Sequence, residues 1–213
     1  VTFLLLPLYT NVFNPNDYGV ISLAYTFMGF MSVVLHYGLD AALLKRYVQS
    51  DVLEKTGYLT SAWFSFLVTS IGFGLLITLF RSWIGPIILG STDNRLMTLV
   101  GWIIAFDIMW SIPQLIFRAE EKPYIYITNS LLNVLGSLTL NLWFVLKLGM
   151  GIYGVLLSNF FVSGSLFILT LPAILTRIKS SEISVLAWKK MMRFGLPFLP
   201  SGIFAMIMEL ADR

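Results

Sequence analysis

The sequence predicts an all-α fold, a polytopic bundle of membrane-spanning helices. Long apolar runs fill the 213 residues, of which 57% are hydrophobic and 12% charged, and the mean hydropathy is +0.83. A soluble domain has about 25% charged residues. Lysine and arginine also gather in every second loop between the runs. Together these patterns indicate a membrane protein with several spans and a definite orientation.

Short polar turns divide the apolar runs into spans. Residues 1–13 are fewer than the about 20 that a span needs, so we expect them to be the end of a truncated first span. The complete spans are expected at residues 18–39, 58–80, 96–117, 124–146 and 152–175. Residues 84–94 contain a Gly-Pro pair and are expected to form a loop. A seventh span begins at Phe194. We therefore expect a six-helix lobe over residues 1–176, a basic linker over 177–193, and the start of a second lobe over 194–213, all as a fragment of a larger transporter.

The basic residues predict which loops face the cytoplasm. The loops after the second, fourth and sixth spans hold ten lysines and arginines, whereas the loops after the first, third and fifth hold three. Because positive residues remain on the cytoplasmic side of a membrane protein, we expect the even-numbered loops to be cytoplasmic.

Composition also limits the chemistry. The chain has no cysteine, which excludes disulfides, Cys-ligated zinc, iron–sulfur clusters and thiol catalysis. His36 is the single histidine, so no multi-His metal site is possible. No short catalytic or phosphate-binding motif is present. We therefore expect no cofactor, no metal and no enzymatic activity, and, because the basic residues lie beside spans, no nucleic-acid partner.

Several spans carry polar residues at helical spacing. In residues 96–117 and just beyond, Asp107, Ser111, Gln114 and Arg118 share one helical face. Such stripes have two interpretations: close packing of helices through hydrogen bonds, or the wall of a water-filled path. An ionisable group in hydrocarbon costs about 2.5–3.5 kcal/mol on insertion scales, so Asp107 favours the second. His36 and Asp40, nearer the predicted cytoplasmic end, are open to either.

The last segments contain two further signals. Ile183, Leu186, Ala187 and Lys190 would share a face if residues 183–193 were helical, so this stretch is either a short surface helix or a solvated connector. Beyond it, Pro197 and Pro200 each remove a helix hydrogen bond. We therefore expect the seventh span to be strongly bent.

Five strings, taken in order, resemble the polysaccharide-biosynthesis flippases of the multidrug/oligosaccharidyl-lipid/polysaccharide exporter superfamily. They are Pro7-Leu8-Tyr9-Thr10 with Asn14-Pro15-Asn16-Asp17-Tyr18-Gly19; Tyr37-Gly38-Leu39-Asp40-Ala41-Ala42 with Arg46-Tyr47; Phe117-Arg118-Ala119-Glu120-Glu121; Arg193-Phe194-Gly195-Leu196-Pro197-Phe198-Leu199-Pro200-Ser201-Gly202; and Ala211-Asp212-Arg213. The resemblance covers essentially the whole chain. It implies two lobes of six helices around a central cavity, alternating access, and an undecaprenyl-diphosphate-linked glycan as substrate, for O-antigen, capsule or exopolysaccharide synthesis.

The resemblance directs the choice of site residues. Arginine can contact phosphate oxygens in a bidentate manner, so Arg213, Arg46 and Arg118 are the candidates for the diphosphate. Arg46 and Arg118 could equally be there only as positive residues on the cytoplasmic side. Asn129 and Asn133 are the candidates for the glycan. The acidic residues are candidates for ion coupling or for gates between lobes: Asp107, Asp40, Glu209 and Asp212.

Two other functions remain open. One is an ion-coupled multidrug-type antiporter from the same superfamily. The other is a membrane glycan polymerase or ligase, which the short outer loops disfavour. As partners we expect the polyprenyl-diphosphate-linked glycan, membrane lipids, and the polymerase and ligase machinery that uses the exported glycan.

Overall fold

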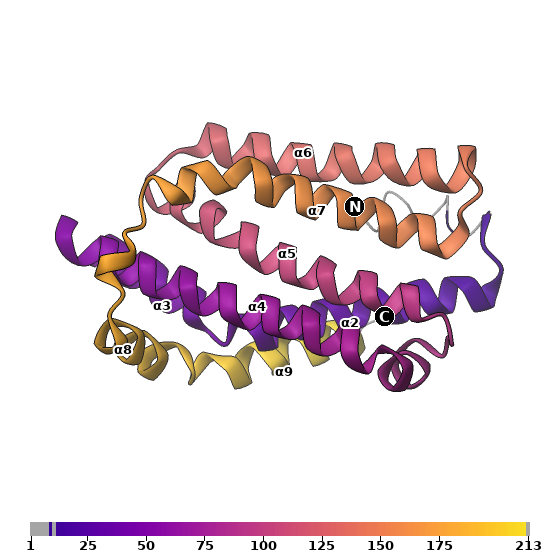
Figure 1. Cartoon of the computed structure of the whole chain (residues 1–213), viewed down its shortest axis with the longest axis horizontal. Coiled ribbons are helices and arrows are strands. Elements are labelled where there is room, and N and C mark those ends of the chain that lie inside the picture. The colour runs from indigo at the N-terminus through magenta and orange to yellow at the C-terminus, as the bar shows by residue number, and fades with distance from the viewer. Residues whose placement is uncertain (1–8, 10–11, 212–213) are drawn as a thin grey trace.

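The computed structural model describes residue 9 and residues 12–211 and shows an elongated bundle of helices (Figure 1). Among the described residues there is no strand. The elements are α2 (Pro15–His36), α3 (Leu39–Gln49), α4 (Val52–Leu89), α5 (Asn94–Ala119), α6 (Pro123–Asn141), the π-helical η1 (Leu142–Lys147), α7 (Gly151–Leu175), the 3₁₀ turn η2 (Ser180–Glu182), α8 (Val185–Gly195) and α9 (Phe198–Ala211). The all-α prediction is confirmed.

Helix α5 is the centre of the bundle. It packs against α4 on one side and α7 on the other, and α6 lies beside α7 (Figure 1). Its most apolar window is 61% buried inside the bundle, against 17–39% for the other long apolar helices. The remaining surface of those helices is suited to lipid, because a helix that is apolar all round must be covered by protein or by membrane.

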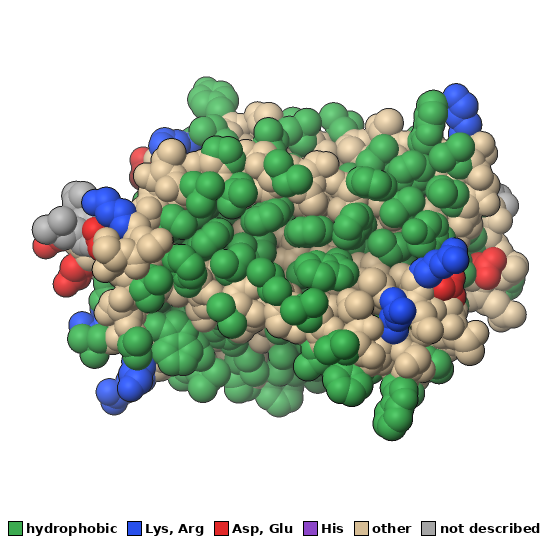
Figure 2. Space-filling view, viewed as in Figure 1, with side chains coloured by type: hydrophobic (Ala, Val, Ile, Leu, Met, Phe, Trp, Pro, Cys, Tyr) green, Lys and Arg blue, Asp and Glu red, His purple; other side chains and the backbone are tan. Residues whose placement is uncertain are grey.

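Five described helices are long and apolar enough to span a membrane, and the bent pair of α8 and α9 could form a sixth span. Figure 2 shows the same property from outside: hydrophobic side chains cover the middle of the visible face, and lysine, arginine and acidic residues lie toward its two ends. The chain is therefore a membrane protein built as a polytopic helical bundle.

The predicted loop over residues 84–94 is wrong. Helix α4 continues to Leu89 with Pro86 inside it, and only four residues separate it from α5. A proline removes one backbone hydrogen bond and bends a helix without always ending it, and the last turns of α4 do change direction (Figure 1). The helix ends instead at Gly90, whose φ of 63° is left-handed, the usual C-terminal stop.

The second predicted span also ends earlier than expected. Asn14 caps α2 through its side-chain oxygen, which accepts from the Asp17 amide at 2.8 Å. The helix stops at His36, because Tyr37 and Gly38 both have positive φ. The chain then forms α3, so Lys45 and Arg46 lie in a helix and not in an open loop.

The basic segment before the seventh span is helical from Val185 to Gly195, so α8 runs two residues into the span predicted to begin at Phe194. Ser184 caps α8 by accepting from the Ala187 amide at 3.2 Å. The helix buries Met191 and presents Val185 and Leu186, which are 65% and 64% exposed. A bend lies at Pro197, where α8 and α9 meet at 45°. Pro200 lies inside α9 and does not interrupt it.

The two helix breaks touch. Gly38, between α2 and α3, packs backbone to backbone against Gly195, at the end of α8. A Cβ atom on either glycine would overlap the other's carbonyl group. Only glycine fits at this crossing, which fixes α8 against the α2–α3 junction.

Candidate functional site: a polar cavity against α5

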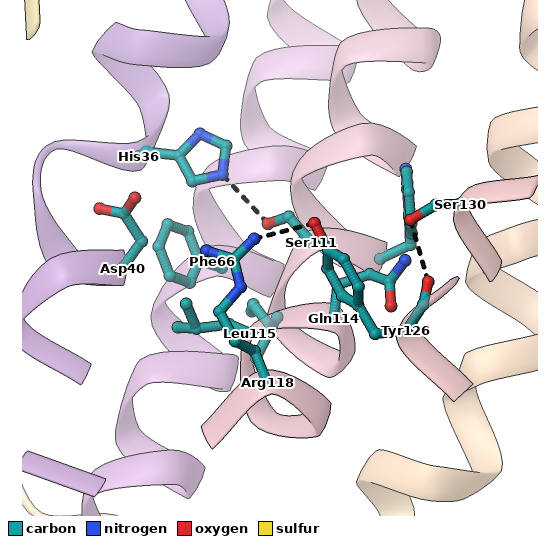
Figure 3. Close-up of a pocket in the computed structure, with 11 residues that line it drawn as sticks. His36, Asp40, Phe66, Ser111, Gln114, Leu115, Arg118, Tyr126 and Ser130 are labelled. Carbon is teal, nitrogen blue, oxygen red and sulfur yellow. Dashed lines mark hydrogen bonds between the residues drawn. The ribbon is translucent and has the colours of Figure 1, made fainter. Parts of the chain in front are cut away.

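A cavity of about 230 Å³ lies between α5 and four neighbouring helices (Figure 3). Helix α5 supplies most of the wall, because side chains three and four residues apart on a helix share a face. The lining residues are His36 from α2, Asp40 from α3, Phe66 from α4, Trp110, Ser111, Ile112, Gln114, Leu115 and Arg118 from α5, and Tyr126 and Ser130 from α6. We call this the α5 cavity.

His36 is fixed from both ring nitrogens. Its Nδ1 lies 2.6 Å from the carbonyl oxygen of Ser32, and its Nε2 lies 3.0 Å from Ser111 Oγ. Because a carbonyl oxygen only accepts, Nδ1 must carry a proton. Ser111 Oγ is also 2.7 Å from the carbonyl of Ile108. The one hydroxyl proton of Ser111 can therefore go to Nε2 of a neutral imidazole or to Ile108 when His36 is charged.

Arg118 brings a positive charge to the wall of the cavity. Its Nη2 donates to Tyr126 Oη at 2.9 Å, and its guanidinium carbon lies 5.0 Å from the centre of the Tyr126 ring. No carboxylate of the described residues pairs with it, although Asp40 lines the same cavity (Figure 3). The remaining guanidinium donors are therefore available to a ligand.

Gln114 leaves an acceptor free. Its side chain is 7% exposed, and its Oε1 has no hydrogen-bond partner among the described residues. A buried acceptor without a partner costs about 1–3 kcal/mol, which a ligand hydroxyl in the cavity could recover. Proteins seldom leave such groups unpaired without a reason.

Two further hollows adjoin the α5 cavity. One, of about 430 Å³, shares His36 and Asp40 with it and extends to Phe198 and Gly202 of α9. The other, of about 470 Å³ at the end of the bundle, shares Arg118 and Tyr126 and is also lined by Lys122. The Arg118–Tyr126 pair therefore stands between the bundle end and the α5 cavity.

Glu120 ties three segments together at the same end. Arg177 donates to both carboxylate oxygens at 2.9 Å, and Tyr47 and Lys122 donate at 2.8 Å and 2.7 Å. These contacts join α3, the turn after α5 and the segment after α7. The hydrogen bonds from Arg177 lower the pKa of Glu120 to about 2.

A different set of polar residues forms hydrogen bonds with protein groups inside the bundle. Asn141 accepts from Tyr9 Oη at 3.0 Å and donates to the carbonyl of Ser137 at 2.9 Å and to Ser158 Oγ at 2.5 Å. Asp107 accepts from Ser163 Oγ at 2.6 Å and from Trp110 Nε1 at 3.1 Å. Tyr9, Asn141 and Ser158 are called the Asn141 network below.

The structure places the predicted site residues in several locations. Asp40 and Arg118 line the α5 cavity, and Arg46 lies apart, between α3 and α8. Asn129 is buried in α6, and Asn133 accepts from Ser137 Oγ at 3.4 Å; neither lines the α5 cavity. Glu209 belongs to α9 but its side chain lies outside the described residues, as do Asp212 and Arg213 entirely.

Sequence reasoning missed the contribution of α6 to the cavity. Tyr126 and Ser130 are four residues apart, so they share a face, and Ser130 Oγ donates to the carbonyl of Tyr126 at 2.9 Å. The spacing of Tyr126 and Ser130 directly after Pro123 could have indicated a polar face on α6. The sequence did not show that this face meets Arg118, because the turn between α5 and α6 brings Arg118 and Tyr126 together.

Comparisons with known proteins agree with this picture. The family described as "Polysaccharide biosynthesis protein" matches residues 1–213, the whole chain. No curated protein and no solved structure matches it significantly. With a full-length family match on a bundle of apolar helices around a polar cavity, the chain belongs to the polysaccharide biosynthesis protein family.

Proposed function

We propose that this chain forms a lobe of a flippase that moves a polyprenyl-diphosphate-linked glycan across the bacterial inner membrane by alternating access. The family ties the chain to polysaccharide biosynthesis and export. The bundle adds a polar cavity among helices that could span the membrane. A carrier of this kind needs a polar site for the headgroup and a lipid-facing exterior for the polyprenyl tail.

The observation that carries the proposal is the free charge of Arg118 at the mouth of the α5 cavity. A guanidinium group presents several donors in a plane that matches phosphate oxygens. Gln114 and Ser130 would meet sugar hydroxyls, and Trp110 offers an aromatic face to a sugar ring. The cavity therefore combines the two chemistries of a diphosphate-linked sugar.

The location of Arg118 suggests the order of contacts. It also lines the hollow at the bundle end that holds Glu120 and Lys122, which the basic residues predict to be cytoplasmic. A diphosphate arriving from that side would meet Arg118 before the glycan reaches Gln114. The Glu120 contacts with Tyr47 and Arg177 would hold this end of the bundle in one of the two conformations that alternating access requires.

Ion coupling in this proposal rests on Asp107, Asp40 and His36. His36 is hydrogen-bonded at both ring nitrogens, and Asp40 lines the cavity on the next helix. A cation bound beside Asp40 would change the charge that faces Arg118 across the cavity. Glu209, Asp212 and Arg213 remain candidates for contacts at the start of a second lobe.

The test is transport in cells that carry the full-length gene. Arg118→Ala is expected to reduce the movement of lipid-linked glycan about 10- to 100-fold, because hydrogen bonds to charged groups contribute about 1.5–3 kcal/mol. Glycan should accumulate on the cytoplasmic face, measured with a glycan-specific label on vesicles of each orientation. Arg118→Lys should recover part of the activity, and Arg95→Ala, an exposed arginine at the other end of α5, should have none of the effect.

Unchanged glycan distribution in an Arg118→Ala variant of normal abundance would remove this site. If deletion of the gene leaves the distribution of lipid-linked glycan unchanged and alters drug tolerance, the protein is an antiporter instead. Each result is read against the abundance of the protein in the same membranes.

A further inference from the structure

We propose that a basic hollow between α3 and α8 binds the phosphate of an anionic membrane lipid. The hollow has a volume of about 490 Å³ and is lined by Arg46, Lys190, Arg193 and Phe194. We call it the α3–α8 hollow. It is separate from the α5 cavity, with which it shares no lining residue, and the proposal does not depend on the transported substrate.

The α3–α8 hollow holds positive charge that no described carboxylate neutralises. Three of the four lining residues are cations, and none of them pairs with a carboxylate among the described residues. Lys45 adds a fourth, with its Nζ 4.2 Å from the centre of the Phe194 ring. Like charges held together repel one another, and a bound anion removes that cost.

The environment of Arg46 also favours a bound anion. Its Nε is buried and has no hydrogen-bond partner among the described residues. Its guanidinium carbon lies 6.0 Å from the centre of the Tyr58 ring, which limits the orientation of the group. A charged donor that is buried without an acceptor is costly, and a phosphate oxygen in the hollow is the acceptor that guanidinium geometry favours.

The pattern of residues on α8 points to a lipid as the source of the phosphate. Helix α8 carries Lys190 and Arg193, which line the hollow, and presents the exposed apolar residues Val185 and Leu186. This pattern is typical of a helix lying in the membrane interface. The next helix, α9, follows after a 45° bend and forms the apolar part of the candidate span. The hollow therefore lies where lipid headgroups are concentrated, and basic clusters at that level attract anionic headgroups.

The anchoring of α8 explains what such a lipid could do. Trp188 Nε1 donates to Ser65 Oγ at 2.9 Å, and the Ser184 amide donates to Ser61 Oγ at 2.9 Å, so one side of α8 is held on α4. Across the hollow, Lys45 of α3 lies over the Phe194 ring of α8 and forms no ion pair with α8. A phosphate bound between Arg46 and Arg193 would link α3 to α8 by charge.

The experiment measures lipid binding to the purified full-length protein in detergent. Phosphatidylglycerol, phosphatidylcholine or inorganic phosphate is added, and the thermal unfolding midpoint and the number of lipids retained in native mass spectrometry are recorded. We expect phosphatidylglycerol alone to raise the midpoint and to be retained. Arg46→Gln should weaken its apparent affinity about fivefold, and the double variant Lys190→Gln/Arg193→Gln about 25-fold, since each basic residue near a surface contributes roughly a factor of five.

Lys189→Gln is the control, because it removes one positive charge from α8 at a residue that does not line the hollow. It should behave as the unchanged protein. Equal retention of phosphatidylglycerol and phosphatidylcholine, or an equal loss in Lys189→Gln and in the double variant, would refute a specific site. A shift with inorganic phosphate as large as with phosphatidylglycerol would overturn the assignment to a lipid. Arg46→Lys keeps the charge and the fold, so its affinity shows whether the planar guanidinium is needed.

Discussion

Two polar regions inside this bundle differ in how completely their hydrogen bonds are satisfied. In the Asn141 network, the buried amide uses both donors and its acceptor on partners from three parts of the chain. In the α5 cavity, Gln114 Oε1 has no partner and the Arg118 side chain donates only to Tyr126, among the residues that the structure describes. The first arrangement holds helices together, and the second leaves capacity for a ligand. The difference shows that polarity within a span does not by itself mark a functional site.

The largest effect on stability should come from breaking the paired region. Asn141→Leu would remove the acceptor of the Tyr9 hydroxyl, at a cost of about 1–3 kcal/mol for a buried unpaired group. Ser158 would keep its hydrogen bond to the Val155 carbonyl. The unfolding midpoint of the purified protein should fall, and transport should fall only in proportion to abundance. A loss of transport per molecule would mean that the Asn141 network belongs to the site after all.

The cavity should respond in the opposite manner. Gln114→Leu removes a buried acceptor that has no partner among the described residues, so stability should not fall and should rise by up to about 1–3 kcal/mol. Transport should fall about tenfold, as for one lost hydrogen bond. Thermal unfolding and the glycan distribution assay would be measured on the same preparations. Clear destabilisation by Gln114→Leu would erase the contrast between the two regions.

Asp107 tests the boundary between the two regions. Asp107→Asn keeps an oxygen for Ser163 and for Trp110, and hydrogen bonds between membrane helices average about 0.6 kcal/mol, so stability should change by less than about 1 kcal/mol. If Asp107 couples transport to an ion, the variant should lose the response of transport to an imposed ion gradient. A full response in Asp107→Asn would place Asp107 with the packing residues.

The smallest effect concerns Glu120 at the bundle end. Because the pKa of Glu120 is lowered from 4.5 to about 2, chiefly by Arg177, its ionised form stabilises the folded state above about pH 4.5. This contribution is lost as the pH falls toward 2. Unfolding midpoints measured between these limits should decline less steeply in Glu120→Gln than in the unchanged protein. Parallel curves would show that the Arg177 contact contributes no stability.

The sequence predicted where the membrane spans lie, but it did not predict which side chains of different spans contact one another. Apolar runs and capping residues such as Asn14 are local signals, so the helices and the bend after α8 were predictable. The extension of α4 through Pro86 was not, because a proline can end a helix or merely bend it. The hydrogen-bond partner of each polar group also could not be predicted, since Tyr9 and Asn141 are 132 residues apart in the chain. The α5 stripe therefore predicted where polar residues gather. Only the tertiary contacts show that Asp107 is bonded to Ser163 whereas Gln114 Oε1 has no partner among the described residues.

The contact between Gly38 and Gly195 has a mechanical consequence. The chain bends at Gly38 and again after Gly195, and these two bends touch backbone to backbone. We therefore expect this contact to act as a hinge: α9 would tilt against α2 without breaking a side-chain contact at that point. The hollow lined by Gly38, His36 and Gly202 lies beside this hinge. Tilting of α9 would change the width of the hollow while α8 stays anchored on α4. A small rotation at the hinge would therefore produce a larger displacement beside His36.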